Sequence, residues 1–142
     1  VTTTIAASGK LTPGTNATAV TVGDVLTQLN SDLAVENISS ALSYQTGISD
    51  YQSFTKVIRF GKMMLINLSF QGSVAGWGAI ATLDVGSSWY PCSFAASDGA
   101  SGSKYAYSYW DATSQKQVLF CGSDGLGSGV HAAQAIMIKR ST

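Results

Sequence analysis

The segment that begins at Lys56 constrains the fold most, because its apolar residues recur at every second position. One alternating set is strongly apolar and comprises Met64, Ile66, Leu68 and Phe70. The other set is mixed in polarity and comprises Met63, Leu65, Asn67 and Ser69. A period of two places the two sets on opposite faces of a β-strand. With the apolar residues 57–60 and the Gly61-Lys62 turn before it, the pattern predicts a β-hairpin.

Further short strands are predicted at residues 79–85, 91–95, 105–110, 117–121 and 132–139. Clusters of Gly, Ser and Asp separate them, and no helical pattern lies between them, which excludes α/β units. Two of these clusters, Ser97-Asp98-Gly99 and Ser123-Asp124-Gly125, look alike and predict hairpin turns, because Asp-Gly supplies the positive φ that such turns require. We expect an all-β fold for residues 51–142, an antiparallel β-sandwich or barrel of jelly-roll-like form.

A short helix is predicted before this β-rich head. Four apolar residues follow the spacing of a heptad seam: Val22, Leu26, Leu29 and Leu33. Thr21 and Asp24 resemble a capping box. A helix of this length is marginal alone in water, so its stripe packs either on its own domain or on two copies from other chains. Residues 1–20 predict a linker or extended arm, and residues 21–50 predict the helix and a connection from stalk to head.

The charge balance bears on the partners. Only 11% of the residues are charged, against about 25% in a typical protein. Eight basic residues offset eight acidic ones, so no net field attracts nucleic acid or an anionic membrane. The sequence has no apolar run long enough to span a bilayer and no signal-peptide pattern. We therefore predict no nucleic acid partner and no membrane insertion, and the start at Val1 suggests a C-terminal fragment of a longer protein.

The sequence contains no pattern typical of a catalytic or cofactor site. His131 is the one histidine, and without a G-x-S-x-G elbow it favours a structural role. The glycine-rich run 122–129 precedes a predicted strand, not the helix that follows a phosphate-binding loop. Cys92 and Cys121 can form one disulfide or remain small buried residues. One histidine and two distant cysteines do not make a zinc site, so we predict no enzyme, no cofactor and no metal.

The aromatic residues are more informative. Tyr105, Tyr107 and Tyr109 alternate along one predicted strand and share a face, opposite Ala106 and Ser108. Their hydroxyl groups make full burial costly without hydrogen-bond partners. Exposed aromatic rings fit sugar rings and also fit protein interfaces, and a carboxylate can bind paired hydroxyl groups. The candidate saccharide contacts are Trp77, Trp89, Tyr90, Tyr105, Tyr107, Tyr109, Trp110 and Asp111.

The order of motifs between residues 60 and 91 is similar to that of a known family. The runs FGKMM, GW and IATL stand at 60–64, 76–77 and 80–83, and they are followed by Gly86 and Pro91. This order resembles the C-terminal receptor-binding domains of bacteriophage tail fibres and baseplate proteins. The sequence departs from the family at Asp84, where a proline often stands.

In that family a trimeric stalk commonly carries a β-rich head that adheres to the host cell. The resemblance therefore implies a virion protein of the phage tail, assembled in the host cytoplasm, that binds a bacterial surface saccharide as a homotrimer. It also implies contact with other tail or baseplate proteins through the N-terminal side. It transfers no ligand-binding residues. Two alternatives stay open, a purely structural tail or baseplate component and a surface-polysaccharide hydrolase that uses Asp111.

Overall fold

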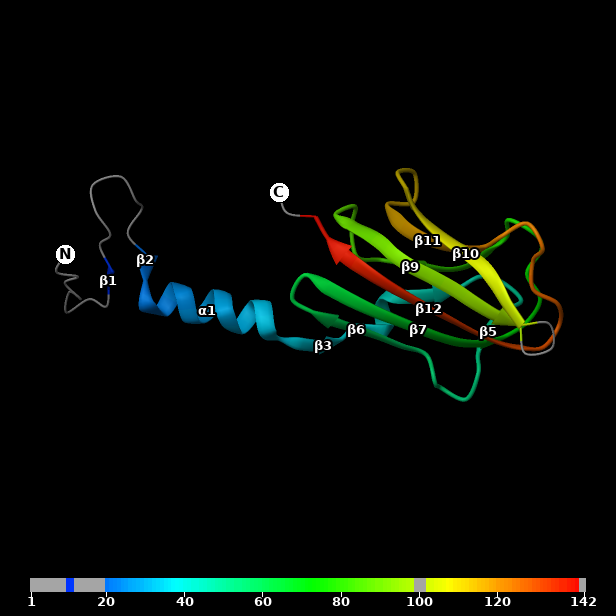
Figure 1. Cartoon of the computed structure of the whole chain (residues 1–142), viewed down its shortest axis with the longest axis horizontal. Coiled ribbons are helices and arrows are strands. Elements are labelled where there is room, and N and C mark those ends of the chain that lie inside the picture. Colours follow the sequence, from blue (N-terminus) through cyan, green and yellow to red (C-terminus); the bar gives the residue numbers. More distant parts are fainter. Residues whose placement is uncertain (1–9, 12–19, 99–101, 141–142) are drawn as a thin grey trace. The chain divides into compact units, whose positions relative to one another are not determined.

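The computed structural model describes residues 10–11, 20–98 and 102–140 (Figure 1). The chain divides into two compact units, Val1–Ala34 and Val35–Thr142, and each is described by itself. The predicted linker at residues 1–20 lies almost entirely outside the described residues.

The first unit contains a two-stranded antiparallel ladder of β1 (Lys10–Leu11) and β2 (Val20–Thr21), followed by helix α1 (Val22–Leu33). The sequence pattern predicts a helix over residues 21–34, and α1 agrees with this span to within one residue at each end. Its heptad stripe is exposed, from 39% at Val22 to 68% at Leu33. An exposed stripe of this spacing is typical of a helix that packs against other helices.

The second unit is a curled antiparallel sheet of half-barrel form, which confirms the predicted all-β class. Its strands are β3 (Val35–Asn37), β4 (Leu42–Tyr44), β5 (Ser49–Asp50), β6 (Lys56–Phe60), β7 (Met63–Gln71), β8 (Ala79–Leu83), β9 (Trp89–Asp98), β10 (Gly102–Asp111), β11 (Lys116–Cys121) and β12 (Val130–Lys139). The spatial order is β3-β6-β7-β12-β9-β10-β11-β8-β4, and β5 pairs with β7. A short 3-10 helix, η1 (Ser39–Ala41), precedes β4.

The predicted hairpin is present as β6 and β7. Gly61 adopts a positive φ of 51° in the turn between them, a conformation that glycine enters without steric cost. The alternating apolar set of β7, from Met64 to Phe70, is fully buried. The recurrence of apolar residues at every second position therefore predicted both the strand and the face that packs in the core.

Strand β10 changes partner along its length. Its first four residues, from Gly102 to Tyr105, pair with β9, and the residues from Ala106 to Asp111 pair with β11. This change lets the sheet fold over a common core. The core draws large apolar side chains from several strands, among them Val57, Phe70, Ile80, Leu83, Trp89, Leu119 and Met137.

Residues 35–50, expected as a connection, belong to the sheet. They form β3, η1, β4 and β5, which pair with β6, β8 and β7. Each of these strands has only two or three residues, too few for an alternating pattern to be visible in the sequence. The compact β unit therefore begins at Val35 and not at residue 51.

His131 is buried and structural in its contacts. Its ring packs on Phe70 with centroids 5.3 Å apart. Its Nε2 lies 2.9 Å from the carbonyl oxygen of Gly72 and 2.8 Å from that of Gly127. Because carbonyl oxygens only accept, Nε2 is the nitrogen that carries the proton. The side chain thereby joins the loop after β7 to the loop before β12.

Candidate functional site

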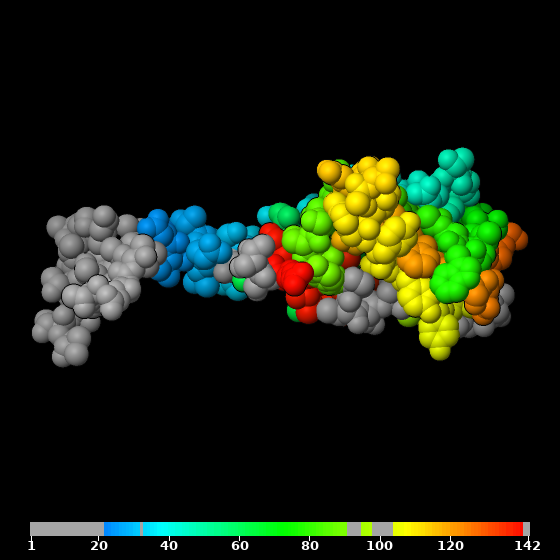
Figure 2. Space-filling model, turned by 90° about the horizontal axis from the view of Figure 1, so that it is seen from above, coloured from blue at the N-terminus to red at the C-terminus, as the bar shows by residue number. Residues whose placement is uncertain are grey.

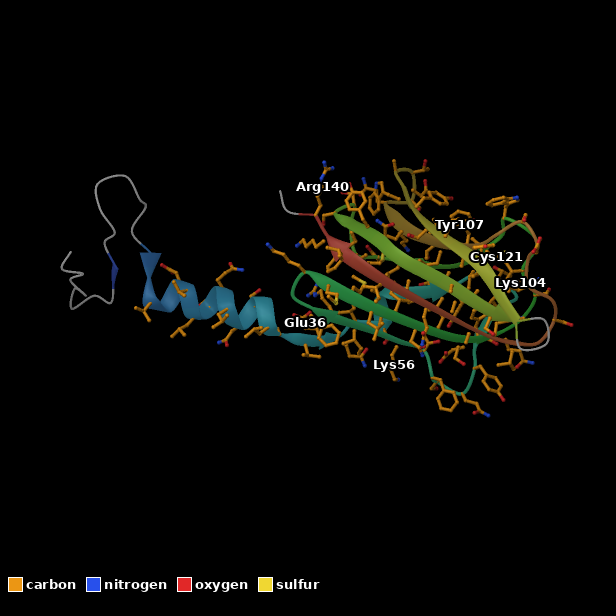
Figure 3. The ribbon with its side chains drawn as sticks, in the orientation of Figure 1. Glu36, Lys56, Lys104, Tyr107, Cys121 and Arg140 are labelled. Atoms are coloured by element: carbon orange, nitrogen blue, oxygen red, sulfur yellow. The ribbon has the colours of Figure 1, made fainter. Side chains whose placement is uncertain are left out.

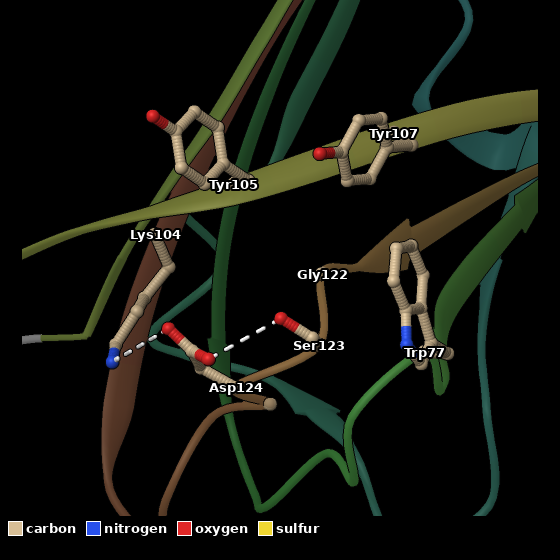
Figure 4. A pocket seen from close by; sticks show the side chains of 8 residues that line it. Trp77, Lys104, Tyr105, Tyr107, Gly122, Ser123 and Asp124 are labelled. Carbon is tan, nitrogen blue, oxygen red and sulfur yellow. Dashed lines mark hydrogen bonds and ion pairs between the residues drawn. The ribbon is translucent and has the colours of Figure 1, made fainter.

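A small, shallow pocket of about 40 Å³, open to solvent, lies where two loops meet β10 (Figure 4). We name it the Trp77 pocket, and its lining residues are Trp77, Lys104, Tyr105, Tyr107, Gly122, Ser123, Asp124 and Gly125. They come from β10, from the loop 72–78 (the Trp77 loop) and from the loop 122–129 (the Asp124 loop). Figure 2 shows the green and orange segments that carry these loops beside yellow β10 at the surface.

The backbone presents Trp77 in an unusual way. The N–H of Gly78 donates to the carbonyl of Ala75 over 2.8 Å and closes a tight turn in which Trp77 has a φ of +60°. The third position of such a turn normally takes Gly or Asn. A bulky residue there costs on the order of 1–3 kcal/mol and persists only where its surroundings hold it. The indole nevertheless remains 63% exposed.

The conformation of Trp77 is held by the Trp77 loop and the Asp124 loop, which main-chain hydrogen bonds join to each other. Val74 and Leu126 exchange backbone hydrogen bonds of 2.8 and 2.7 Å. Gly76 packs directly against the carbonyl of Ser123, where a Cβ would clash. Gly125 has the predicted positive φ, at +62°, but the prediction of a hairpin turn at Ser123-Asp124-Gly125 is wrong, because the flanking strands β11 and β12 do not pair with each other. Gly99 of the similar sequence lies outside the described residues.

Cys121 lies beneath the Trp77 loop. Its thiol donates to the carbonyl of Ala75 over 3.0 Å, and burial raises the pKa of this thiol. The thiol is free and has no accessible surface. The side chain of Cys92 lies outside the described residues.

The exposed rings form a connected platform. The Trp77 and Tyr107 rings stack with centroids 5.9 Å apart, and Tyr107 stacks on Phe120 at 5.5 Å. Tyr107 and Phe120 are direct cross-strand partners, so strand register brings them together. Tyr109 meets the edge of Phe120 at 5.4 Å. As predicted, Tyr105, Tyr107 and Tyr109 share an exposed face while Ala106 is buried.

A pair of opposite charges borders the platform. Lys104 Nζ lies 3.8 Å from Asp124 Oδ2, and the Ser123 hydroxyl donates to Asp124 Oδ1 over 3.3 Å. The side chain of Asp124 is 71% exposed, and that of Lys104 is 23% exposed. Figure 3 places Lys104, Tyr107 and Cys121 along the β10 side of the sheet. No sequence pattern marks Lys104, Phe120 or Asp124 as a site residue, although Asp124 stands in a predicted turn.

Seven of the eight predicted saccharide contacts line one of two hollows, and Asp111 lines neither. Trp77, Tyr105 and Tyr107 meet at the Trp77 pocket. A second hollow, at the start of β9 and the end of β10, is lined by Ser87, Trp89, Tyr90, Ser108, Tyr109, Trp110 and Gln117. Trp89 is only 3% exposed, and its carbonyl accepts a 3.0 Å hydrogen bond from Gln117 Nε2, so it belongs mainly to the core.

Asp111, the eighth predicted contact, makes its hydrogen bonds within its own hairpin turn. Its Oδ1 accepts from the Thr113 N–H over 3.0 Å, and its Oδ2 accepts from the Ser114 hydroxyl over 2.6 Å. The hydrogen bond from Ser114, followed by that from Thr113, lowers the pKa of this carboxyl group. Its predicted contact with a saccharide stays a prediction, and it lines neither hollow.

A second surface, on the outer face of the sheet, is apolar. Five residues in register across β3, β6, β7, β12 and β9 form what we name the apolar row: Val35, Phe60, Met63, Ile138 and Tyr90. Each is between 40% and 66% exposed. The next row adds Ile58, Leu65 and Ile136, whereas the row beyond it is polar. Contiguous exposed apolar surface of this kind usually marks an interaction site.

Comparisons with known proteins gave no match to a family model, a curated protein or a solved structure. Within residues 10–11, 20–98 and 102–140, no three His, Cys, Asp or Glu side chains gather in a way that could hold a metal ion. Over the same residues, no helix has the length and apolar character needed to cross a membrane.

Proposed function

We propose that this chain is a host-adhesion module of a bacteriophage tail that binds a bacterial surface saccharide in the Trp77 pocket. The observation that carries the proposal is the exposed Trp77 ring, held on a backbone conformation that a bulky residue rarely adopts. Backbone strain of this kind clusters at ligand-binding sites, because selection for folding alone would remove it. A glycine at position 77 would relieve the strain, but it would remove the ring.

The chemistry of the pocket supports a sugar as the ligand. The indole and the Tyr107 ring offer flat apolar surface against which the C–H groups of a pyranose can pack. Lys104, Ser123 and Asp124 offer donors and acceptors at the rim of that surface. Their charges balance, as do those of the whole chain. An uncharged polyhydroxyl ligand suits this combination better than a nucleotide or an anionic lipid does.

Two exposed apolar features support self-association in the same proposal. The stripe of α1 has heptad spacing, which packs against copies of itself in coiled coils. The apolar row offers further surface on the head. The number of subunits, three, comes from the resemblance to phage tail fibre and baseplate heads.

The test uses the complete chain and its Trp77→Ala variant. We expect the chain to bind cells from a panel of bacterial strains and glycans from their surfaces, and we expect the variant to lose this binding. Trp77 is mostly exposed, so the variant should keep the Tm and the oligomeric state of the original chain. Phe54→Ala is the matched control, because Phe54 is also an exposed aromatic residue, at 57%, and lies outside the pocket.

Equal cell binding by the original chain and Trp77→Ala would overturn the proposal. A folded chain that binds no cells and no glycans on the panel would also count against it. A trimeric mass in light scattering is expected, and a monomer at micromolar concentration would overturn the subunit count alone.

A structural tail or baseplate component is the second candidate, and the apolar row favours it. In that case the exposed rings contact other subunits, and Trp77→Ala would change assembly instead of cell binding. Light scattering of the variant therefore separates the two candidates.

A further inference from the structure

We infer that the Trp77 pocket selects uncharged sugars with two neighbouring hydroxyl groups, and that Lys104 and Asp124 make this selection. The inference rests on the proposed function, since it names the class of saccharide that the same pocket takes.

The geometry of the charged pair leaves hydrogen-bonding capacity unused. The Nζ–Oδ2 distance of 3.8 Å exceeds the length of a hydrogen bond. Among the described residues, the Lys104 ammonium group has no hydrogen-bond acceptor, although it carries three donors. Asp124 Oδ2 likewise lacks a hydrogen-bond donor there, since the Ser123 hydroxyl is directed to Oδ1. One donor and one acceptor therefore stand side by side at the rim of the pocket.

Neighbouring ring hydroxyl groups match this arrangement. A hydroxyl group both donates and accepts, so one sugar oxygen can accept from Lys104 while the adjacent one donates to Asp124. Hydrogen bonds to charged groups are stronger than those between neutral groups. A single hydroxyl group, or two that are separated along the ring, can satisfy only one member of the pair.

The position of the pair relative to the rings is suitable. Lys104 directly precedes Tyr105, and Asp124 follows Ser123, next to the floor formed by Gly122. Figure 4 shows the pair on one side of Ser123 and the Trp77 ring on the other. A pyranose that packs on Trp77 thus presents its edge hydroxyl groups to Lys104 and Asp124.

The balance of charge explains the preference for uncharged sugars. A carboxylate on the sugar would gain from Lys104 but would be repelled by Asp124, which is the more exposed of the two. The free ammonium group of an amino sugar would instead be attracted by Asp124 and repelled by Lys104. A carboxylate offers Asp124 no hydrogen-bond donor and an ammonium group offers Lys104 no acceptor, so each satisfies one member of the pair and is repelled by the other, whereas two neutral hydroxyl groups satisfy both.

The experiment titrates the full chain with methyl glycosides of glucose, galactose and mannose and with the matching uronic acids. Binding is followed by NMR at the indole N–H of Trp77. We expect at least one neutral glycoside to bind about tenfold more tightly than its uronic acid, because the carboxylate offers Asp124 no hydrogen-bond donor and is repelled by it. Asp124→Asn should reverse this order by removing the repulsion, whereas Lys104→Met should weaken binding of both.

Asp84→Asn and Lys116→Met are the matched controls, since each makes the same charge change outside the pocket. Equal binding of neutral and acidic sugars to the original chain would overturn the inference, as would an Asp124→Asn variant that keeps its preference. If cells bind in a Trp77-dependent way but no glycoside does, the inference fails while the proposed function stands. If Trp77→Ala still binds cells, the proposed function fails.

Discussion

The backbone N–H of Trp77 donates a 3.0 Å hydrogen bond to the carbonyl oxygen of Gly122. Trp77 supplies the main ring of the pocket, and Gly122 forms its floor. A Cβ at Gly122 would stand 3.2 Å from the Tyr105 carbonyl and 3.5 Å from the Tyr107 ring. The bare α-carbon therefore keeps the pocket open at the place where the ring is anchored.

Gly76→Ala should separate the Trp77 loop from the Asp124 loop, because its new Cβ would clash with the Ser123 carbonyl. We expect a lower Tm, a stability loss of about 1–3 kcal/mol for an overpacked site, and loss of saccharide binding. Gly127→Ala is the control, since a Cβ there meets open space in the same loop. Thermal unfolding and glycan binding measure the effect, and a Gly76→Ala variant equal to the control would contradict it.

Tyr44 should make the fold sensitive to alkaline pH. Burial raises the pKa of its hydroxyl to about 12, although Thr55 lies within 2.5 Å and opposes the shift. The ordinary pKa is about 10 in an unfolded chain, so the folded state holds the proton more tightly. This contribution to stability is complete below about pH 10 and is lost as the pH rises toward 12.

Denaturant unfolding at several alkaline pH values tests this prediction. Tyr44→Phe should lose about 1 kcal/mol near neutral pH, because the hydrogen bond between Tyr44 and Thr55 is removed, while Thr55 keeps its two hydrogen bonds to Ser69. It should also flatten the decline in stability above pH 10. Parallel declines in the two chains would show that Tyr44 is not the group responsible.

Asp111→Ala should weaken the β10–β11 hairpin without abolishing saccharide binding. The carboxylate accepts hydrogen bonds from Thr113 and Ser114, and its lowered pKa means that the folded state favours the ionised form. Its contribution is therefore present above the unfolded pKa of about 4 and is lost as the pH falls below that value.

We expect the Tm of Asp111→Ala to lie a few degrees below that of the original chain at neutral pH. This difference in Tm should be smaller in acid. Asp84→Ala serves as the control for loss of one carboxylate outside this turn. Loss of glycan binding by Asp111→Ala with an unchanged Tm would instead support the contact with sugar that the sequence predicts.

If the apolar row is a subunit interface, as proposed, Ile138→Lys should dissociate the oligomer while leaving the pocket intact. Ile138 stands within the apolar row, between Met63 and Tyr90, and is 46% exposed. A charge there adds little strain to the single chain but opposes burial between subunits. Gln134→Lys is the control, because Gln134 lies on the same strand and face in a polar row. Light scattering measures the mass, and an unchanged oligomer would exclude this face from the interface.

Local patterns in the sequence predicted the parts of the fold in which one face is buried. Strand β12 shows this well, since its residues alternate between exposed and buried from Val130 to Met137. The heptad spacing likewise located α1. The strands β3 to β5 were missed because each is too short to complete a period.

The candidate site was predictable only in its aromatic residues. Trp77, Tyr105 and Tyr107 were selected as rings, but an aromatic residue looks the same in sequence whether it is exposed, as Trp77 is, or buried, as Trp89 is. Lys104 and Asp124 meet because the Asp124 loop starts beside β10, where the Gly122 N–H donates to the Tyr105 carbonyl over 2.7 Å. No local pattern encodes such a tertiary contact.

The ties between the Trp77 loop and the Asp124 loop are made by main-chain atoms, from Val74 to Leu126 and from Trp77 to Gly122. The side chains at positions 123 and 124 are therefore not required to maintain the shape of the pocket. Exchanges there can change the ligand while the framework is retained. A protein built in this way can acquire a new ligand specificity through one or two substitutions, and the same two positions are a practical starting point for a library of altered specificities.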